Sequence, residues 1–388
     1  MSRGKIMKIC IFVRILWPGG VQSIAFGEAK SLADRGHKVD LIFLRDSGRG
    51  KHPWSYWHPY SVIYSSEINQ RPLHRLFCFI TRIYAPERGE DSTVDLDLIK
   101  KFERKRDKYD IIIYYDQLSA FYANLGEKLH GDRFIVNVME TMYKRKRLLE
   151  RYVERRALKN ASGIITIGEK NYNILSKTQK KNLYLLYPGT ELISNAPGFR
   201  QREDRILSVT MWDRGRHPEL FLGIAKLLKR GTIYLMGDWT DKSFLNEYLE
   251  KVKSMGLADK IIVTGRIKKE ELVMSYSLAK VLVRFGFDEF GPGMATLEAI
   301  GYGLPLIINN GIGMKEIIDS FGIDPSIVID PDDFNGITEA IGKLLEDEEG
   351  WNLKHKNALS LAKSMSWEEH GRRLENIINE ITLRDQNE

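Results

Sequence analysis

Short apolar runs alternate with stretches of helical periodicity from the beginning of the chain to about residue 365. Runs rich in Val, Ile, Leu and aromatic residues, bounded by Gly, Pro or charged residues, are typical of buried strands. Their alternation with helical stretches indicates parallel sheets of the doubly wound α/β class. A helix is predicted over 21–35, and strands are predicted at 8–14, 38–44, 61–64, 110–115, 133–138, 163–167 and 182–187.

A second series of the same kind follows a polar segment. Residues 189–204, GTELISNAPGFRQRED, predict a linker. The later strands are predicted at 205–209, 232–237, 260–265, 280–285, 305–309 and 326–330. We therefore predict two tandem Rossmann-like domains, residues 1–190 and 191–365, that face a cleft. The helical segment 366–388 is predicted to return to the first domain.

Composition restricts the class of protein. The chain has 388 residues, of which 43% are hydrophobic and 29% charged, and this suits two globular domains better than one core. Its first apolar run is broken by Arg14, which predicts a strand and not a signal peptide. No stretch approaches the roughly 20 apolar residues of a membrane span. Cys10 and Cys78 lie in apolar surroundings, which predicts inert thiols and a cytoplasmic location.

The net charge and the histidine content indicate which binding partners and metal ions to expect. The net charge of +7 favours an anionic partner, whether a nucleotide, a phosphate or an acidic membrane. The eight histidines are scattered, and no cluster has metal-ligand spacing, so no metal and no cofactor are expected. Nucleic-acid binding has only the basic charge in its favour.

The segment GFDEFGPGMATLEAIGYGLPLI, residues 286–307, combines a glycine-rich turn with a helix start at about Met294. Gly291 and Gly293 lie between a strand's carboxyl end and a helix's amino end, where free N–H groups favour an anion. Glu298 lies about one turn inside the helix, where its carboxylate could accept hydrogen bonds from two ribose hydroxyls. The alternative is an ordinary βα turn with a solvated glutamate.

Residues 289–305, EFGPGMATLEAIGYGLP, resemble the donor-binding signature of the retaining group 1 glycosyltransferases, which have the two-domain GT-B architecture. That signature has a glutamate, an aromatic-glycine turn, and a second glutamate followed by Ala and G-x-P. Three further segments are similar to the family in the same order, so the resemblance covers nearly the whole chain: 18–42, 265–283 and 311–318.

The resemblance implies that the second domain binds a nucleotide-diphosphate sugar and the first an acceptor. It implies that Glu298 binds the ribose and Glu289 contacts the hydroxyls of the donor sugar. The family separates its two glutamates by seven residues, whereas eight lie between these two, and this leaves Asp288 as a neighbouring candidate. Glu316 either contacts the donor or begins a helix.

Cations are expected where the diphosphate gains charge during transfer. In SVTMWDRGRHPELF, residues 208–221, Arg214 and Arg216 lie in the loop that carries paired basic residues in the family. A direct overlay instead places Met211 and His217 at the usual basic positions. The alternative for both arginines is a solvated surface role.

The first domain is expected to contribute backbone and acceptor contacts. The resemblance implies that Gly19 and Gly20 offer N–H groups to the diphosphate or the acceptor; an ordinary βα turn is the alternative. The family often carries a histidine near the reacting centre, and the corresponding segments here have none. The candidate acceptor ligands, with core or capping roles as alternatives, are Asp116, Asn137 and Glu140.

Two segments of the first domain suggest a membrane surface. Residues 71–84 have apolar residues at helical spacing among basic ones, and residues 141–160 hold eight Lys or Arg against two Glu. Packing on a core and a solvated charge run are the alternatives. An anionic membrane would suit a lipid-linked acceptor and a peripheral location.

The resemblance therefore implies a retaining hexosyltransferase that uses a nucleotide-diphosphate sugar and a lipid-linked or glycan acceptor. The alternatives are a non-catalytic sugar-nucleotide-binding subunit and a soluble sugar-phosphate or storage-glycan synthase. A dehydrogenase would need GxGxxG after the first strand, and WPGGVQSIA does not supply it.

Overall fold

The computed structural model describes residues 6–16, 19–46, 61–64, 109–115, 134–139, 155–178, 182–287, 289 and 291–384. The chain divides into two compact units. Unit 1 comprises Met1–Gly189 and Trp367–Glu388, and unit 2 comprises Thr190–Ser366. These divisions lie one residue from each domain boundary proposed from the sequence.

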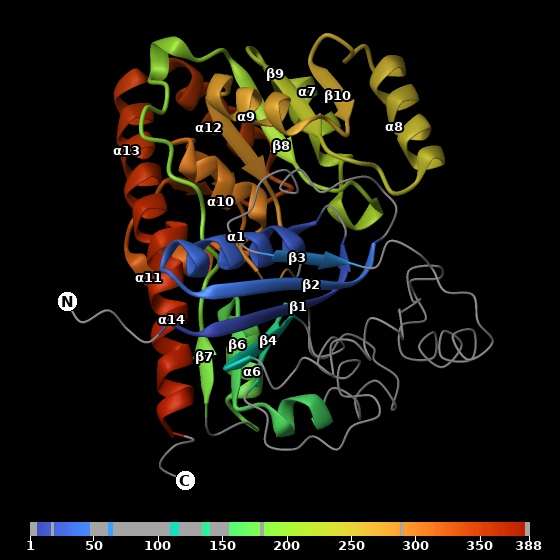
Figure 1. Ribbon diagram of the computed structural model, residues 1–388. Helices are drawn as coiled ribbons and strands as arrows, with labels where there is room; N and C mark the ends of the chain where they lie inside the picture. The colour runs from blue at the N-terminus through green and yellow to red at the C-terminus, as the bar shows by residue number, and fades with distance from the viewer. Residues whose placement is uncertain are drawn as a thin grey trace. The chain divides into compact units, whose positions relative to one another are not determined.

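Unit 1 is built on a parallel sheet of seven strands in the order β3-β2-β1-β4-β5-β6-β7 (Figure 1). Each strand coincides with one of the apolar runs: β1 Lys8–Leu16, β2 Lys38–Asp46, β3 Ser61–Tyr64, β4 Ile111–Tyr115, β5 Phe134–Val138, β6 Gly163–Thr166 and β7 Leu183–Leu185. The chain adds β2 and β3 on one side of β1 and the later strands on the other. The sheet is therefore doubly wound, with its switch point between β1 and β4.

The C-terminal helix belongs to unit 1, as predicted. In this unit α1 spans Gly20–Asp34, α6 spans Glu169–Leu175 and α14 spans Trp367–Arg384, and residues 155–160 are also helical. Ser31 Oγ of α1 donates a 2.6 Å hydrogen bond to the Trp367 carbonyl. The Trp367 ring occupies the space that a Cβ atom on Gly27 or Gly189 would need. Small residues thus let α14 approach α1 closely.

A buried polar network also ties α14 to unit 1. The Tyr115 hydroxyl donates to Glu28 of α1, and the other Glu28 oxygen lies 3.0 Å from His370 Nε2. His370 Nδ1 lies 2.8 Å from the Tyr187 carbonyl oxygen. Because buried polar groups cost free energy unless they are hydrogen-bonded, this network specifies how α14 docks.

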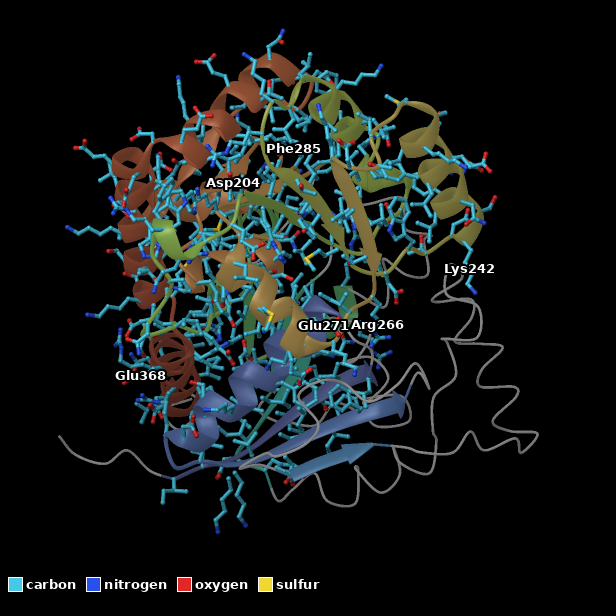
Figure 2. All side chains as sticks on the ribbon, turned by 90° about the horizontal axis from the view of Figure 1, so that it is seen from above. Asp204, Lys242, Arg266, Glu271, Phe285 and Glu368 are labelled. Atoms are coloured by element: carbon cyan, nitrogen blue, oxygen red, sulfur yellow. The ribbon has the colours of Figure 1, made fainter. Side chains whose placement is uncertain are left out.

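Unit 2 has a parallel sheet of six strands in the order β10-β9-β8-β11-β12-β13. Their bounds again match the predicted runs: β8 Arg205–Val209, β9 Thr232–Met236, β10 Ile261–Gly265, β11 Val281–Arg284, β12 Leu306–Ile308 and β13 Ser326–Val328. Figure 2 shows the packed side chains of this unit, with Phe285 labelled just after β11. The predicted α/β fold class, with two tandem doubly wound units, is confirmed.

Helices cover both faces of this second sheet (Figure 1). They are α7 Leu220–Leu227, α8 Lys242–Ser254, α9 Lys269–Leu278, α10 Met294–Gly301, α11 Met314–Phe321, α12 Phe334–Glu346 and α13 Glu348–Ser364, with 3-10 turns at Phe199–Gln201 and Arg214–Arg216. The switch point lies between β8 and β11, whose following loops meet at the carboxyl edge of the sheet. In doubly wound sheets this is where ligands bind.

Candidate active site

The loop from β11 to α10 is held by close backbone packing against the loop from β12 to α11. Glu289 N donates to the Gly311 carbonyl at 3.3 Å, and Gly313 N donates to the Gly291 carbonyl at 3.2 Å. A Cβ atom on Gly286 or Gly313 would lie 2.7 Å from backbone atoms of the opposite loop. Several of the glycines are therefore needed because two backbones lie in contact.

Gly293 is needed for a different reason. It precedes α10 with a φ of +73°, which lies in the left-handed region that favours glycine. In the first turn of α10 that follows, Thr296 N donates to the Gly293 carbonyl at 3.0 Å. Met294, the residue after Gly293, begins the helix as predicted and is partly buried. Asp288 and Phe290 of this loop lie outside the described residues.

An ion cluster joins the β8 and β11 loops. Glu289 Oε1 accepts a hydrogen bond from Arg284 Nη2 at 2.5 Å and another from Arg216 Nη1. Its second oxygen lies 3.7 Å from the point where a Cβ atom on Gly293 would be. The structure thus brings together two of the predicted site residues, Arg216 and Glu289, and adds Arg284.

The two arginines of this cluster differ in burial. The Arg284 side chain is 6% exposed, and burial, together with the nearby Arg216 charge, lowers its pKa to about 9. The Arg216 side chain is 34% exposed, and burial lowers its pKa as well. Asp213 opposes both shifts. The two guanidinium groups thus lie near two carboxylates: Glu289, which contacts both of them, and Asp213.

Glu298 lies in α10, where it faces α9. The Tyr276 hydroxyl donates a 2.8 Å hydrogen bond to Glu298 Oε2. Tyr276 is 2% exposed and stacks on Tyr302 with ring centroids 5.4 Å apart. Burial raises the pKa of Glu298 to about 7; the Tyr276 hydrogen bond opposes this rise and the charge of Glu191 adds to it. The carboxylate is thus held in one orientation and is easily protonated.

The remaining predicted residues of unit 2 lie outside these contacts. Arg214 pairs with Glu247 at 3.2 Å, and its guanidinium lies 4.4 Å from the centre of the Phe244 ring. Glu316 lies in the first turn of α11. Met211 is exposed, and the His217 ring lies tilted against Phe287 with ring centroids 4.3 Å apart.

In unit 1, Gly19 precedes α1 and Gly20 is its first residue, so both lie at the β1 end of the switch point. Asn137 of β5 is fully buried, and its side chain lies beside the Tyr115 hydroxyl. Asp116 and Glu140 lie outside the described residues, as do 71–84 and 141–154. The acceptor contacts therefore stay predictions.

Sequence reasoning missed Arg284 and Tyr276. A visible signal for Arg284 was a charged residue at the end of the otherwise apolar run KVLVRF. Charged residues are rarely buried unless they are paired, so this one needed an explanation. Tyr276 lies within the segment 265–283 that is similar to the family, but only the fold places its hydroxyl against Glu298.

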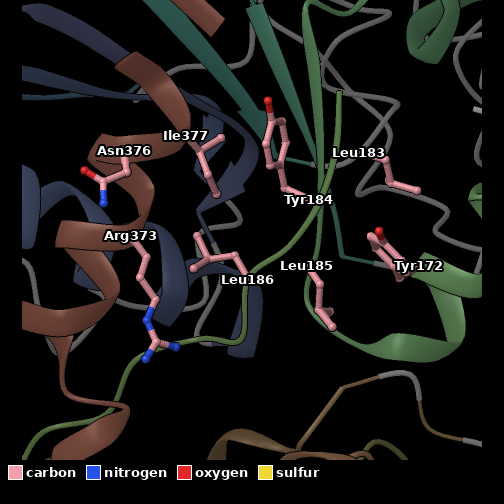
Figure 3. Close-up of a pocket in the computed structure, with 8 residues that line it drawn as sticks. All are labelled: Tyr172, Leu183, Tyr184, Leu185, Leu186, Arg373, Asn376 and Ile377. Carbon is pink, nitrogen blue, oxygen red and sulfur yellow. The ribbon is translucent and has the colours of Figure 1, made fainter. Parts of the chain in front are cut away.

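A pocket of about 590 Å³ lies in unit 1, between β7, α6 and α14 (Figure 3). It is lined mainly by apolar side chains of β7 together with Tyr172 of α6 and Arg373 of α14. None of the predicted site residues lines it.

Among the residues that the structure describes, no group of three or more His, Cys, Asp or Glu side chains is arranged to hold a metal ion. No helix in the same ranges combines the length and apolar character needed to cross a membrane.

Two family models match the chain. Residues 206–347 match the model for Glycosyl transferases group 1, and residues 19–172 match the model for a Glycosyl transferase 4-like domain. The first match contains the whole ion cluster and Glu298. The second contains Gly19 and Gly20.

Similarity to individual proteins is partial in sequence and nearly complete in fold. A probable sucrose-phosphate synthase 4 of rice is 29% identical over 136 residues, which cover 34% of this chain and 12% of that protein. The O-antigen chain mannosyltransferase B of Escherichia coli is 31% identical over 104 residues, which cover 27% of this chain and 26% of that protein. The structure of Anabaena HepE in complex with UDP-glucose aligns with a TM-score of 0.69 and 15% identity, over 96% of this chain and all of that one.

Proposed function

The chain belongs to the group 1 glycosyltransferases, and from this premise we propose that it transfers a hexose from a nucleotide-diphosphate sugar to a lipid-linked or glycan acceptor. Transfer proceeds with retention of the anomeric configuration and without a metal ion. The observation that carries the proposal is the meeting of Arg216 and Glu289 beside the start of α10, with Glu298 in the same helix. This arrangement combines an anion site with a ribose site.

The donor binds to unit 2 in this proposal. Glu298 accepts hydrogen bonds from the ribose hydroxyls, and the first turn of α10 faces the diphosphate, where its free N–H groups favour negative charge. Gly291, Gly293 and Met294 form the backbone that approaches the phosphates, and Glu316 lies on the neighbouring helix start. The similar fold of the HepE complex with UDP-glucose supports a donor of this class.

The reaction breaks the bond between the anomeric carbon and the diphosphate oxygen. The leaving diphosphate gains negative charge as this bond breaks, and Arg216 stabilises that charge in the transition state. Glu289 Oε2, whose partner oxygen is held by the arginines, accepts a hydrogen bond from the donor sugar. The acceptor oxygen bonds to the anomeric carbon on the same face, and the leaving phosphate takes the acceptor's proton. Arg214 stays a predicted phosphate contact.

The acceptor side of the proposal rests on the sequence. Gly19 and Gly20 of unit 1 offer backbone N–H groups, and the basic run 141–160 binds an anionic membrane surface at the cytoplasmic face. The partial similarity to an O-antigen mannosyltransferase supports a glycan acceptor.

A sugar-phosphate synthase is the second candidate, because the rice sucrose-phosphate synthase matches a longer stretch of the chain than the mannosyltransferase does. The two candidates differ in acceptor and not in donor. A third possibility, a binding subunit without catalysis, predicts nucleotide affinity without turnover.

One experiment separates these candidates. The purified chain is titrated calorimetrically with UDP-, GDP- and ADP-sugars, and the donor that binds is then incubated with hexose phosphates or with lipid-linked glycan extracts. We expect nucleotide diphosphate release to depend on the glycan extract. Release with hexose phosphates alone would favour the synthase, and binding without any release would favour the non-catalytic subunit.

A further inference from the structure

Arg284 is a buried cation at the carboxyl end of an apolar strand. The three preceding residues of β11 are fully buried, and Arg284 itself is 5% exposed. Burying a charge costs free energy unless the charge is paired. Glu289 forms an ion pair with Arg284 through Oε1, but the same oxygen also pairs with Arg216. The pairing therefore leaves part of the positive charge without a direct partner.

Both arginines keep unused hydrogen-bond donors. A guanidinium carries five N–H groups. Within the described residues, Arg284 bonds the Phe285 carbonyl through Nη1 and Glu289 through Nη2, and Arg216 bonds only Glu289. Several N–H groups on each side chain thus lack an acceptor. A ligand with several charged oxygens would satisfy them.

The position of Arg284 at the carboxyl edge of the sheet indicates that this ligand carries phosphate groups. Its strand ends at the switch point beside β8, and Glu289 reaches from it toward Gly293 at the start of α10. Met211 and His217 occupy the places where basic residues were expected, so the β8 loop offers fewer cations near this point. Arg284, at the end of β11, would supply a second cation in place of the basic residues that are missing from the β8 loop.

We propose that Arg284 is a diphosphate-binding residue, and that Glu289 bridges it to Arg216 so that two like charges can stand together. The inference rests on the proposed function and adds to it a residue from β11. Paired arginines suit phosphate because each can donate two parallel hydrogen bonds to it. The affinity gained should increase with the charge on the ligand's phosphates.

The test compares ligands of different phosphate charge. Calorimetry measures UDP, UDP-glucose and UMP binding to the wild-type chain, to Arg284→Gln and to Arg284→Lys; GDP or ADP replaces UDP if it binds more tightly. For Arg284→Gln we expect the affinity for UDP to fall about 10-fold or more. The affinity for UDP-glucose should fall less, and the affinity for UMP should fall by less than about 3-fold. Arg284→Lys should lose less than Arg284→Gln.

A matched variant provides the control. Arg200→Gln removes an exposed arginine that pairs with Glu348 in the same unit, and it should bind all ligands as the wild type does. Melting curves report whether each variant is folded.

Two results would overturn the inference. If folded Arg284→Gln and Arg284→Lys bind the diphosphate as the wild type does, Arg284 only holds Glu289 in place. Equal losses for all three ligands would also contradict phosphate recognition. If the wild-type chain binds none of the nucleotides, the proposed donor site itself fails, and this inference fails with it.

Discussion

Tyr276 donates a 2.8 Å hydrogen bond to Glu298, and the phenol is itself almost completely buried. The carboxylate proposed to bind ribose is therefore oriented by a group that cannot move without disturbing the packing between α9 and α10. Such support fixes a binding group more firmly than a solvated side chain would be fixed.

Replacing Glu298 with Ala should weaken nucleotide-sugar binding by about 2 to 4 kcal/mol, because two hydrogen bonds to a charged group are lost. Calorimetry with the preferred nucleotide measures this. Glu270→Ala is the matched control, since Glu270 is an exposed carboxylate on α9. Unchanged nucleotide affinity in a folded Glu298→Ala chain would show that the ribose site lies elsewhere.

The raised pKa of Glu298 predicts a pH dependence of stability. Its pKa is about 7 in the folded chain, against 4.5 for an unperturbed glutamate. Between these values the folded chain binds more protons than the unfolded chain, so stability falls as pH rises from about 4.5 to about 7. Glu298→Gln should remove this contribution. The melting temperature of the variant should therefore exceed that of the wild type by more at pH 8 than at pH 5, and a constant difference would contradict the shift.

Removing Arg216 should lower kcat more than it raises the KM for the donor, because the diphosphate gains charge only as the bond breaks. Steady-state assays of Arg216→Gln against several donor concentrations measure both. An increase in donor KM with unchanged kcat would mean that Arg216 binds ground state and transition state equally.

If the acceptor is lipid-linked, the chain should sediment with anionic vesicles and not with neutral ones, and salt should weaken this binding. Changing Lys144, Arg145, Lys146 and Arg147 together to Gln should reduce vesicle binding, since each basic residue near the surface contributes about 1 kcal/mol. Nucleotide affinity should not change. Full activity on a soluble acceptor without vesicle binding at low salt would favour the sugar-phosphate synthase.

The strands could be predicted from the sequence because a buried parallel strand must be a short apolar run, and all thirteen observed strands lie on such runs. The helix α14 itself was predictable from its helical period. The residues that hold it were not, because Glu28, Tyr115 and His370 come from three distant segments and only the fold brings them together.

The site was predictable in part. The glycine-rich turn and Glu298 stand out because they resemble the donor-binding signature of the group 1 glycosyltransferases; the turn alone left an ordinary βα turn as the alternative. The place of Glu289 could not be settled from its spacing, since an extra residue can be absorbed anywhere in a loop. Its contacts with Arg216 and Arg284 depend on the strand order β8-β11, which no local pattern encodes.

The backbone contact between the two glycine loops has a consequence for sequence variation. A side chain added at Gly286 or Gly313 would collide with main-chain atoms of the opposite loop, which cannot rotate away as a side chain can. Substitutions at these positions should therefore be removed by any selection for activity, and a second change within one loop should not rescue them. The two loops are therefore constrained as a single unit, although 26 residues lie between Gly286 and Gly313 in the sequence.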